Sequence, residues 1–200
     1  NFKLKQTGNE EVVLANPSGA ILDSITIRPT QLNHSYGRTA NGLATWGFFT
    51  SPTPNASNTG SYLGYANKPT FNVTPGFYSS AQNVIITSND PLCTIRYTTD
   101  GTDPIPNSTL YTGPIIVDST ALIRARCFSS NSAVLPSFIE TNTYFINASH
   151  TLPVISLGGD YNYLFASWNM ELPSSLEYFD KTGAFQFEGF GESNKHGNDS

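Results

Sequence analysis

The stretch Cys93–Val117 constrains the fold more than any other part of the chain. Apolar and polar side chains alternate over residues 93–98, which is the period-2 pattern of a half-buried strand. Asp100-Gly101 then ends the strand, because Gly adopts positive φ freely and Asp-Gly is among the strongest turn dipeptides. A short apolar strand follows at residues 115–117. The stretch therefore predicts short strands separated by turns, as in a β-sandwich.

Composition supports a secreted β-rich class of protein. Charged residues make up 12% of the 200 residues, about half the usual share. A hydrophobic content of 38% suits small sandwich cores, and no run of about 18 apolar residues predicts a membrane-spanning helix. The net charge of −5 argues against nucleic acid and against anionic membrane surfaces as partners. The chain opens on the strand-like FKLKQ and not on a signal peptide, which favours a mature or trimmed chain.

Two cysteines, Cys93 and Cys127, are present, so neither a disulfide framework nor a Cys-based zinc cluster is expected. If both face the core on antiparallel neighbouring strands, their sulfurs lie close together. Two interpretations stay open: a Cys93–Cys127 disulfide, or a pair of buried free thiols. The three histidines lack metal-ligand spacing, and we expect no metal and no cofactor.

Residues 1–60 read as strands and long loops. An apolar run at 12–14 and a strand-like segment at 21–27 flank an Asn-Pro-Ser-Gly turn and predict a hairpin. Asp-Ser, Ser-Tyr-Gly-Arg, Trp and Pro-Thr-Pro follow in order, and this succession resembles the C-terminal part of a lamin-tail domain. Asn55 departs from the Gly usual in that family, and the opening strands of that immunoglobulin-like domain are missing. Residues 61–69 are polar and punctuated by Gly and Pro, which indicates a linker.

Residues 70–147 carry the longest motif. The string Y-T-x-D-G-x-x-P, then a Ser, then Y-x-G-P-I runs from Tyr97 to Ile115. It resembles the small β-sandwich at the C-terminus of chitobiase and β-hexosaminidase enzymes, which also occurs as a detached module in many bacterial surface proteins. Strands are expected near 84–88, 93–99, 114–117, 121–128 and 138–146, around a core of Ile86, Ile95, Tyr97, Ile116, Ile123 and Ala125. We expect residues 68–147 to fold alone.

Residues 150–200 differ in character. A buried-type strand at 152–157 precedes a possible helical turn from Tyr161 to Phe165, and segments 175–180 and 184–188 form a hairpin pattern. The order L-P-V-I-S-L, Y-F-D-x-x-G and a Gly-rich stretch resembles the opening of a CotH-type, spore-coat kinase-like domain. In that family the ATP-binding Lys and metal-binding Asp lie further along the chain than Ser200. The resemblance therefore implies no role for a residue present here.

Three groups of residues are candidates for chemistry, and each has a plainer interpretation. Asp100 and Asp103 are either oxygen ligands for calcium or, as we favour, parts of a turn in which the Asp before Gly caps its own loop. Aromatic residues in or beside loops either stack on sugar rings or, as we favour, close the first module or pack at its interface with the second; the candidates for stacking are Trp46, Tyr62 and Tyr65. The acid/base candidates near one another in the last segment are His150, Asp160 and Glu177.

The sequence thus predicts an all-β protein of immunoglobulin-like β-sandwich modules with very little helix. The expected organisation is a partial lamin-tail-like domain (1–60), a linker (61–69), a chitobiase C-terminal-like sandwich (70–147) and the N-terminal fragment of a CotH-like domain (150–200). The function expected is that of a non-catalytic accessory or spacer region of a secreted bacterial multidomain surface protein. Its expected partners are polysaccharide or cell-envelope components. The alternatives are a carbohydrate-binding module and the N-terminal part of a kinase-like enzyme.

Overall fold

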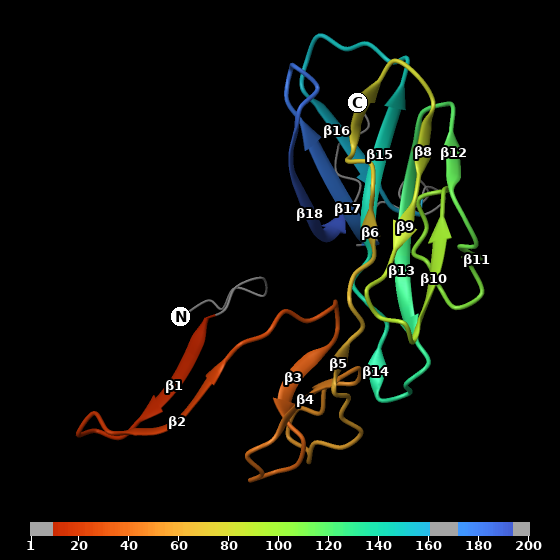
Figure 1. Cartoon of the computed structure of the whole chain (residues 1–200). Helices are drawn as coiled ribbons and strands as arrows, with labels where there is room; N and C mark the ends of the chain where they lie inside the picture. The colour runs from red at the N-terminus through yellow and green to blue at the C-terminus, as the bar shows by residue number, and fades with distance from the viewer. Residues whose placement is uncertain (1–9, 161–171, 194–200) are drawn as a thin grey trace, which may run out of the picture. The chain divides into compact units, whose positions relative to one another are not determined.

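The computed structural model describes residues 10–160 and 172–193, and the chain divides into two compact units, residues 1–64 and 65–200 (Figure 1). Every regular element in the described part is a strand, so the prediction of an all-β fold is confirmed. In the same part, no helix is long and apolar enough to cross a membrane. The helical turn expected from Tyr161 to Phe165 lies outside the described residues.

The first unit consists of two hairpins. β1 (Glu11–Ala15) pairs with β2 (Ile21–Thr26), and β3 (Ser35–Arg38) pairs with β4 (Trp46–Phe49), both antiparallel. The first hairpin turns at Gly19, where a φ of 84° suits Gly, and the Asn16 side chain accepts hydrogen bonds from Ser18 and Ala20. The large apolar side chains of this hairpin are exposed on both of its faces, namely Val12, Val13, Leu14, Ile21 and Leu22.

A five-stranded sheet forms the centre of the second unit, in the order β11-β10-β13-β15-β7. The strands are β7 (Gly76–Tyr78), β10 (Cys93–Thr98), β11 (Thr109–Leu110), β13 (Ala121–Ser129) and β15 (Glu140–Ile146). Neighbours are antiparallel except β15 and β7, which are parallel. The central strands lie within a few residues of the sequence prediction, because alternation and turn dipeptides mark their ends.

Short strands cover one face of this sheet, which we call the inner face. They are β6 (Thr70–Phe71) with β9 (Ile86–Thr87), and β8 (Gln82–Val84) with β12 (Ile115–Val117). The core between the two layers consists of Val84, Ile86, Val117, Ile123, Ala125, Tyr144 and Ile146. The expectation that Ile116 belongs to this core is wrong: Ile116 is 65% exposed, and its neighbours in β12 point inward instead.

The residues expected to form a linker are in part packed into the second unit. β5 (Gly64–Tyr65) is followed by Ala66, whose N–H donates to the carbonyl of Leu135 in β14 (Val134–Leu135) at 2.8 Å. Ala66 and Pro69 are buried. The segment after Gly64 therefore behaves as part of a folded unit, in the extended form expected of it.

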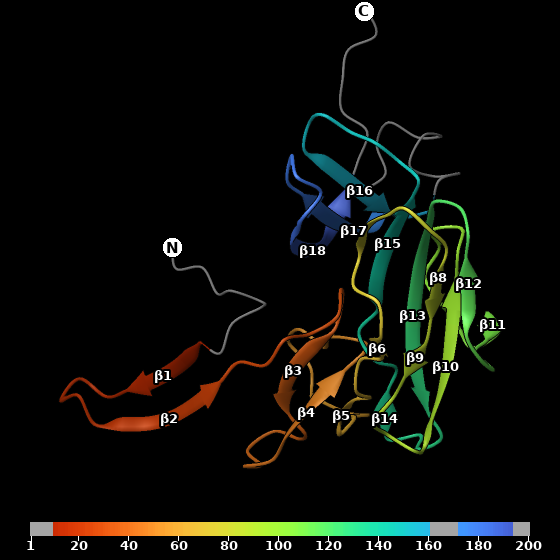
Figure 2. The ribbon, with the colours of Figure 1, turned by 45° about the horizontal axis from the view of Figure 1, so that its top comes forward.

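A second, smaller sheet packs against the other face of the central sheet, which we call the outer face. It contains β16 (Val154–Gly158), β17 (Leu172–Phe179) and β18 (Phe185–Ser193), all antiparallel. Figures 1 and 2 both draw it beside β15. The buried ring of Phe179 meets Phe145 edge-on at 5.4 Å and Phe77 at 5.9 Å between centroids. The segments expected as a sandwich (70–147) and as the start of another domain (150–200) thus share one compact unit.

Candidate functional site

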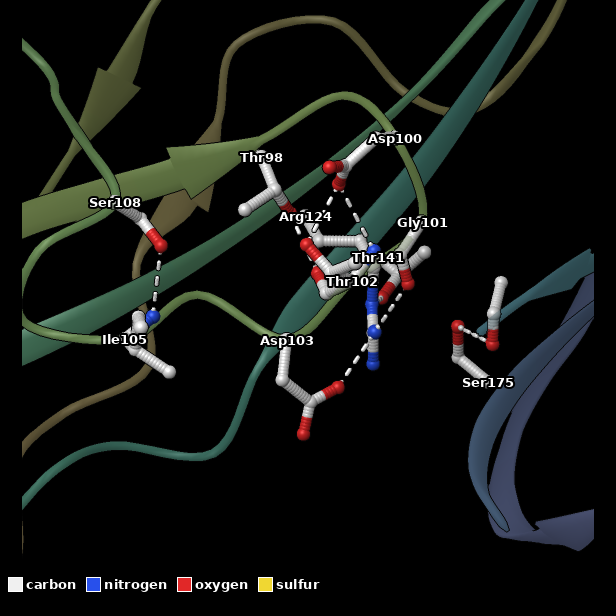
Figure 3. A network of polar contacts seen from close by, with 11 residues as sticks. Thr98, Asp100, Gly101, Thr102, Asp103, Ile105, Ser108, Arg124, Thr141 and Ser175 are labelled. Carbon is white, nitrogen blue, oxygen red and sulfur yellow. Dashed lines mark hydrogen bonds and ion pairs between the residues drawn. The ribbon is translucent and has the colours of Figure 1, made fainter. Parts of the chain in front are cut away.

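Arg124 in β13 anchors the loop that carries the sequence motif (Figure 3). Its side chain is 2% exposed, and a buried guanidinium requires partners for its hydrogen atoms. Nη1 donates to the carbonyl of Gly101 at 2.7 Å and forms an ion pair with Asp103 at 2.6 Å. Nε donates a longer bond of 3.4 Å to the Thr141 hydroxyl. Arg124 therefore holds the loop against the outer face of the sheet.

Asp100 shapes the same loop from within. Its carboxylate accepts hydrogen bonds from the Thr102 N–H at 3.0 Å and the Thr102 hydroxyl at 2.6 Å, and these bonds lower the pKa of Asp100. Gly101 has a φ of 85°, and a Cβ there would lie 2.5 Å from the carbonyl oxygen of Gly159. The prediction of a self-capping turn is confirmed. No cluster of three His, Cys, Asp or Glu side chains suited to a metal occurs among residues 10–160 and 172–193.

Glu177 of β17 is a buried acidic residue at the interface between the two sheets. It is 1% exposed, and its carboxylate accepts hydrogen bonds from the N–H of Thr143, at 3.2 Å, and from the Thr143 hydroxyl. β7 pairs with residues 144–146 of β15, so the Thr143 N–H lies just before the paired part of that edge. Glu177 thus supplies the acceptor that a neighbouring strand would otherwise provide. Burial raises the pKa of Glu177 to about 7.

Two of the three acid/base candidates, His150 and Glu177, are held in separate contacts. Both Glu177 oxygens are engaged by Thr143. The ring of His150 packs on Phe77 at 4.2 Å between centroids, and its Nδ1 lies 2.8 Å from the carbonyl of Leu152. These contacts hold the smaller sheet and the segment before it in place, and they leave Glu177 without solvent access.

A pocket of about 410 Å³ lies at the first half of β15, beyond the end of its pairing with β7. Two rings contribute apolar wall: Phe71 from β6 and Phe185 from β18. Asn142 lies in the wall and is 4% exposed. Its amide nitrogen donates to the carbonyl of Val73 and to the Tyr144 hydroxyl, both at 3.2 Å, which fixes the orientation of the amide and leaves its carbonyl oxygen as an acceptor.

Lys68 forms a charged cluster in the wall of this pocket. Its ammonium lies between the carboxylates of Glu140 and Glu188, with the second at 2.9 Å, and 5.8 Å from the ring centroid of Phe190. Burial lowers the pKa of Lys68, but hydrogen bonds to the two carboxylates outweigh it and the pKa is raised. Burial also raises the pKa of Glu140, against the effect of Lys68. With one cationic and two carboxylate side chains, the cluster has a formal net charge of −1.

The three aromatic candidates lie in different contacts. The guanidinium of Arg38 lies over the ring of Trp46 at 5.1 Å, and Tyr36 packs beside it at 5.4 Å. Tyr62 forms a backbone bridge with Phe48. Tyr65, in the second unit, packs on Phe138 at 5.0 Å between centroids. Each of the three residues thus has a contact within the chain, and their role in stacking on sugar stays a prediction.

The two cysteines lie on neighbouring strands as the pattern predicts, and both are free thiols in the structure. Cys93 pairs with Ser129, and Cys127 pairs with Ile95, so the cysteines occupy diagonal positions of β10 and β13. The Cys93 thiol donates to the Asp90 carboxylate at 3.2 Å. Burial raises the pKa of Cys93 to about 12 and also raises the pKa of Cys127.

Sequence reasoning singled out Asp100 and Asp103 but missed Lys68, Glu140 and Glu188. These three come from a presumed linker, the start of a strand and a hairpin, and no spacing relates them. A signal was nevertheless present: charged residues are scarce in this chain, and Glu188 stands in the apolar run FQFEGF. A lone carboxylate among aromatic residues on a strand calls for a partner.

Comparisons with known proteins find similarity in the middle of the chain. Residues 73–135 match the family model of the chitobiase/beta-hexosaminidase C-terminal domain. An endoglucanase from Clostridium saccharobutylicum is 43% identical over 72 residues, which cover 36% of this chain and 15% of that protein. No solved structure matches the chain significantly. Residues 73–135 are therefore similar to an accessory domain of carbohydrate-active enzymes, as the motif implied.

The family match includes neither the lamin-tail-like nor the CotH-like segment, so those two resemblances stay predictions. The matched part begins at Val73 in the pocket region and ends at Leu135 in β14. It therefore contains Arg124 with its partners Gly101 and Asp103, but neither Thr141 nor Glu140 nor β16–β18. The pocket and the Glu177 contact both depend on residues outside the matched segment.

Proposed function

We propose that this chain is a non-catalytic accessory and spacer region of a secreted multidomain bacterial surface protein that acts at polysaccharide. The proposal rests on the polar motif residues, whose side chains are taken up by contacts within the chain. Arg124, Asp100 and Asp103 are engaged in contacts within the loop and the sheet. Residues that build a loop and fasten it to a sheet serve the shape of the module.

The outer face supports the same proposal. Glu177 is the buried acid of the second unit whose pKa is raised toward neutrality, as a general acid requires, but Thr143 occupies both of its oxygens. A proton donor must reach a substrate, and a side chain that is 1% exposed does not. Its role is to join the smaller sheet to the central sheet, which makes residues 65–193 suitable as a stiff spacer.

The similarity to the endoglucanase and to the chitobiase C-terminal domain supports a location beside carbohydrate-active domains. Proteins that act on polymeric glycans meet them outside the cell. The low share of charged residues fits this placement, because surfaces of hydroxyl and amide groups are typical of secreted β modules. Extracellular placement and a polysaccharide partner are parts of the proposal.

The test is to incubate the purified chain with chitooligosaccharides and cellooligosaccharides, and separately with ATP, magnesium and a generic acceptor. We expect no product above the background of a mock purification. Turnover that follows the protein through purification and is lost in Glu177→Gln would contradict the proposal. The Phe187→Ala variant is the matched control, because Phe187 is an exposed residue of the neighbouring strand.

A further inference from the structure

We propose that the pocket between β6, β15 and β18 binds one neutral pyranose ring of a polysaccharide. This binding function goes beyond the spacer role, because it assigns a ligand to residues that lie partly outside the matched family segment. The volume of about 410 Å³ falls in the range of about 300–1,000 Å³ typical of small-ligand sites. A sugar ring fits such a space with room for solvent.

The apolar part of the wall suits the carbon face of a sugar. Phe71 and Phe185 come from strands far apart in sequence, and both line the pocket. Phe185 is 38% exposed although its ring edge packs against Phe179, so part of it remains available to a ligand. The C–H face of a pyranose packs on such rings through apolar contact. A ligand with no apolar face would leave the two aromatic rings in contact with water.

The polar part of the wall suits hydroxyl groups. Asn142 offers a carbonyl oxygen whose direction is fixed by the two bonds of its amide nitrogen. Glu140 and Glu188 offer carboxylate oxygens that accept hydrogen bonds, and the Lys68 ammonium offers donors. A hydroxyl both donates and accepts, so a ring of hydroxyls can use acceptors and donors that stand side by side.

Charge excludes the competing classes of ligand. The cluster of Lys68, Glu140 and Glu188 has a formal net charge of −1, which repels phosphate and carboxylate ligands. A cationic ligand would have to displace Lys68, which is already held by both carboxylates. A fully apolar ligand would strip water from the charged cluster without replacing its hydrogen bonds. A neutral polyhydroxyl ring avoids all three costs.

The experiment is an NMR titration of the whole chain with cellotriose, chitotriose and inorganic phosphate as separate probes. We expect amide shift changes at residues 68–74, 140–142 and 185–188 with one or both saccharides, at a Kd of about 1 mM, and none with phosphate. Comparison of the two saccharides distinguishes a glucan from a chitin source of the ring. Equal shifts with phosphate would overturn the assignment of a neutral ligand.

Two variants and one control locate the site. Phe185→Ala removes an aromatic ring from the pocket wall and should weaken saccharide binding about tenfold. Glu188→Gln removes a charged hydrogen-bond acceptor but keeps a bond to Lys68, so it should weaken binding about fivefold. Phe187→Ala on the same strand, outside the pocket, should leave binding unchanged. The absence of shifts at the pocket amides, or binding that both pocket variants leave intact, would overturn the proposal. Shifts that map to Trp46 instead would overturn it in favour of a site in the first unit.

The binding experiment and the test of the proposed function can fail independently of each other. Binding without turnover supports both proposals, and turnover overturns the spacer role without bearing on the pocket. Failure of saccharide binding leaves the non-catalytic proposal intact, since that proposal depends on Arg124 and Glu177 and not on the pocket.

Discussion

The two faces of the central sheet are buried in opposite ways. On the inner face Ile123, Ala125 and Tyr144 pack into an apolar core against short strands. On the outer face the alternate residues of the same strands include Arg124 and Thr143, which are as well buried but polar. The inner face therefore excludes water by apolar contact, whereas the outer face combines the ring contacts of Phe179 with paired charges and hydrogen bonds.

The difference determines how each face responds to change. Apolar packing is non-directional, so the inner face tolerates substitutions that keep size and shape. A buried polar group is costly unless its partner is present in the right place. The outer face therefore depends on single contacts, such as that of Glu177 with Thr143.

Removal of the buried ring of Phe179 should have the largest effect. This side chain meets Phe77, Phe145 and Phe185, and Phe179→Ala leaves a cavity between the sheets. We expect a loss of about 3–5 kcal/mol in the free energy of unfolding, measured by urea denaturation. Phe187→Ala is the matched control and should cost about 1 kcal/mol, because Phe187 is exposed and packs mainly on Tyr178. Equal costs for both variants would show that the smaller sheet does not pack as described.

Replacement of Glu177 should change how stability depends on pH. Burial raises its folded-state pKa from 4.5 to about 7, so the folded protein favours the protonated acid. The stabilisation is full below about pH 4.5 and is lost as pH rises to about 7, at about 1.4 kcal/mol per pH unit. Above pH 7, the folded protein has lost a total of about 3 kcal/mol of this stabilisation.

Glu177→Gln keeps a neutral side chain at all pH values and isolates this effect. The variant should match the wild type near pH 4.5 and exceed its stability by up to about 3 kcal/mol at pH 8, since Gln pays no cost for a buried charge. Thermal unfolding of both proteins between pH 4.5 and 8 checks this. A constant difference across that range would contradict the prediction, because it would mean that Glu177 has an ordinary pKa in the fold.

The ion pair between Arg124 and Asp103 should contribute less to the free energy of unfolding than the burial of Arg124 suggests. Asp103 is 43% exposed, so water reaches one side of the pair and weakens it. Asp103→Asn leaves the guanidinium with the Gly101 carbonyl as its remaining close partner. We expect a loss of about 1–2 kcal/mol in chemical denaturation. Asp23→Asn breaks the exposed pair with Arg38 and should cost less than about 0.5 kcal/mol, and a smaller loss for Asp103→Asn than for Asp23→Asn would contradict the contrast.

The sequence predicted the inner face well and the outer face poorly, for a physical reason. Alternation places Ile123 and Ala125 on one face, and apolar side chains need only a common interior to become buried. Arg124 and Thr143 occupy the polar phase of the same alternation, which ordinarily faces water. Thr143 contacts a sheet that follows later in the chain, and Arg124 contacts a loop that precedes it, so no local pattern announces either contact. The error at Ile116 has a related cause, since a run of three apolar residues does not fix which ones point inward.

The candidate site was likewise predictable only in its locally determined part. The turn at Asp100 follows from a local dipeptide and was found. The pocket is formed by residues 68–75, β15 and β18, whose approach depends on the end of the β7–β15 pairing at residue 144. Register and strand length of that kind arise from tertiary packing. A reading of single segments therefore identifies turns and cores but misses sites assembled between them.

The cysteine pair should show the smallest effect, because it lies on the apolar face, where no partner is needed. The two side chains occupy diagonal positions and are close enough to hydrogen-bond, yet both are free thiols, and the raised pKa of Cys93 slows its oxidation. We therefore expect two free thiols, with an intact mass equal to that of the reduced chain and two groups titrated after unfolding. Cys93→Ser should change stability by less than about 0.5 kcal/mol, since a hydroxyl can also donate to Asp90. A mass two daltons lower, restored by reductant, would instead establish the disulfide and show that this end of the inner face is fastened by a covalent bond.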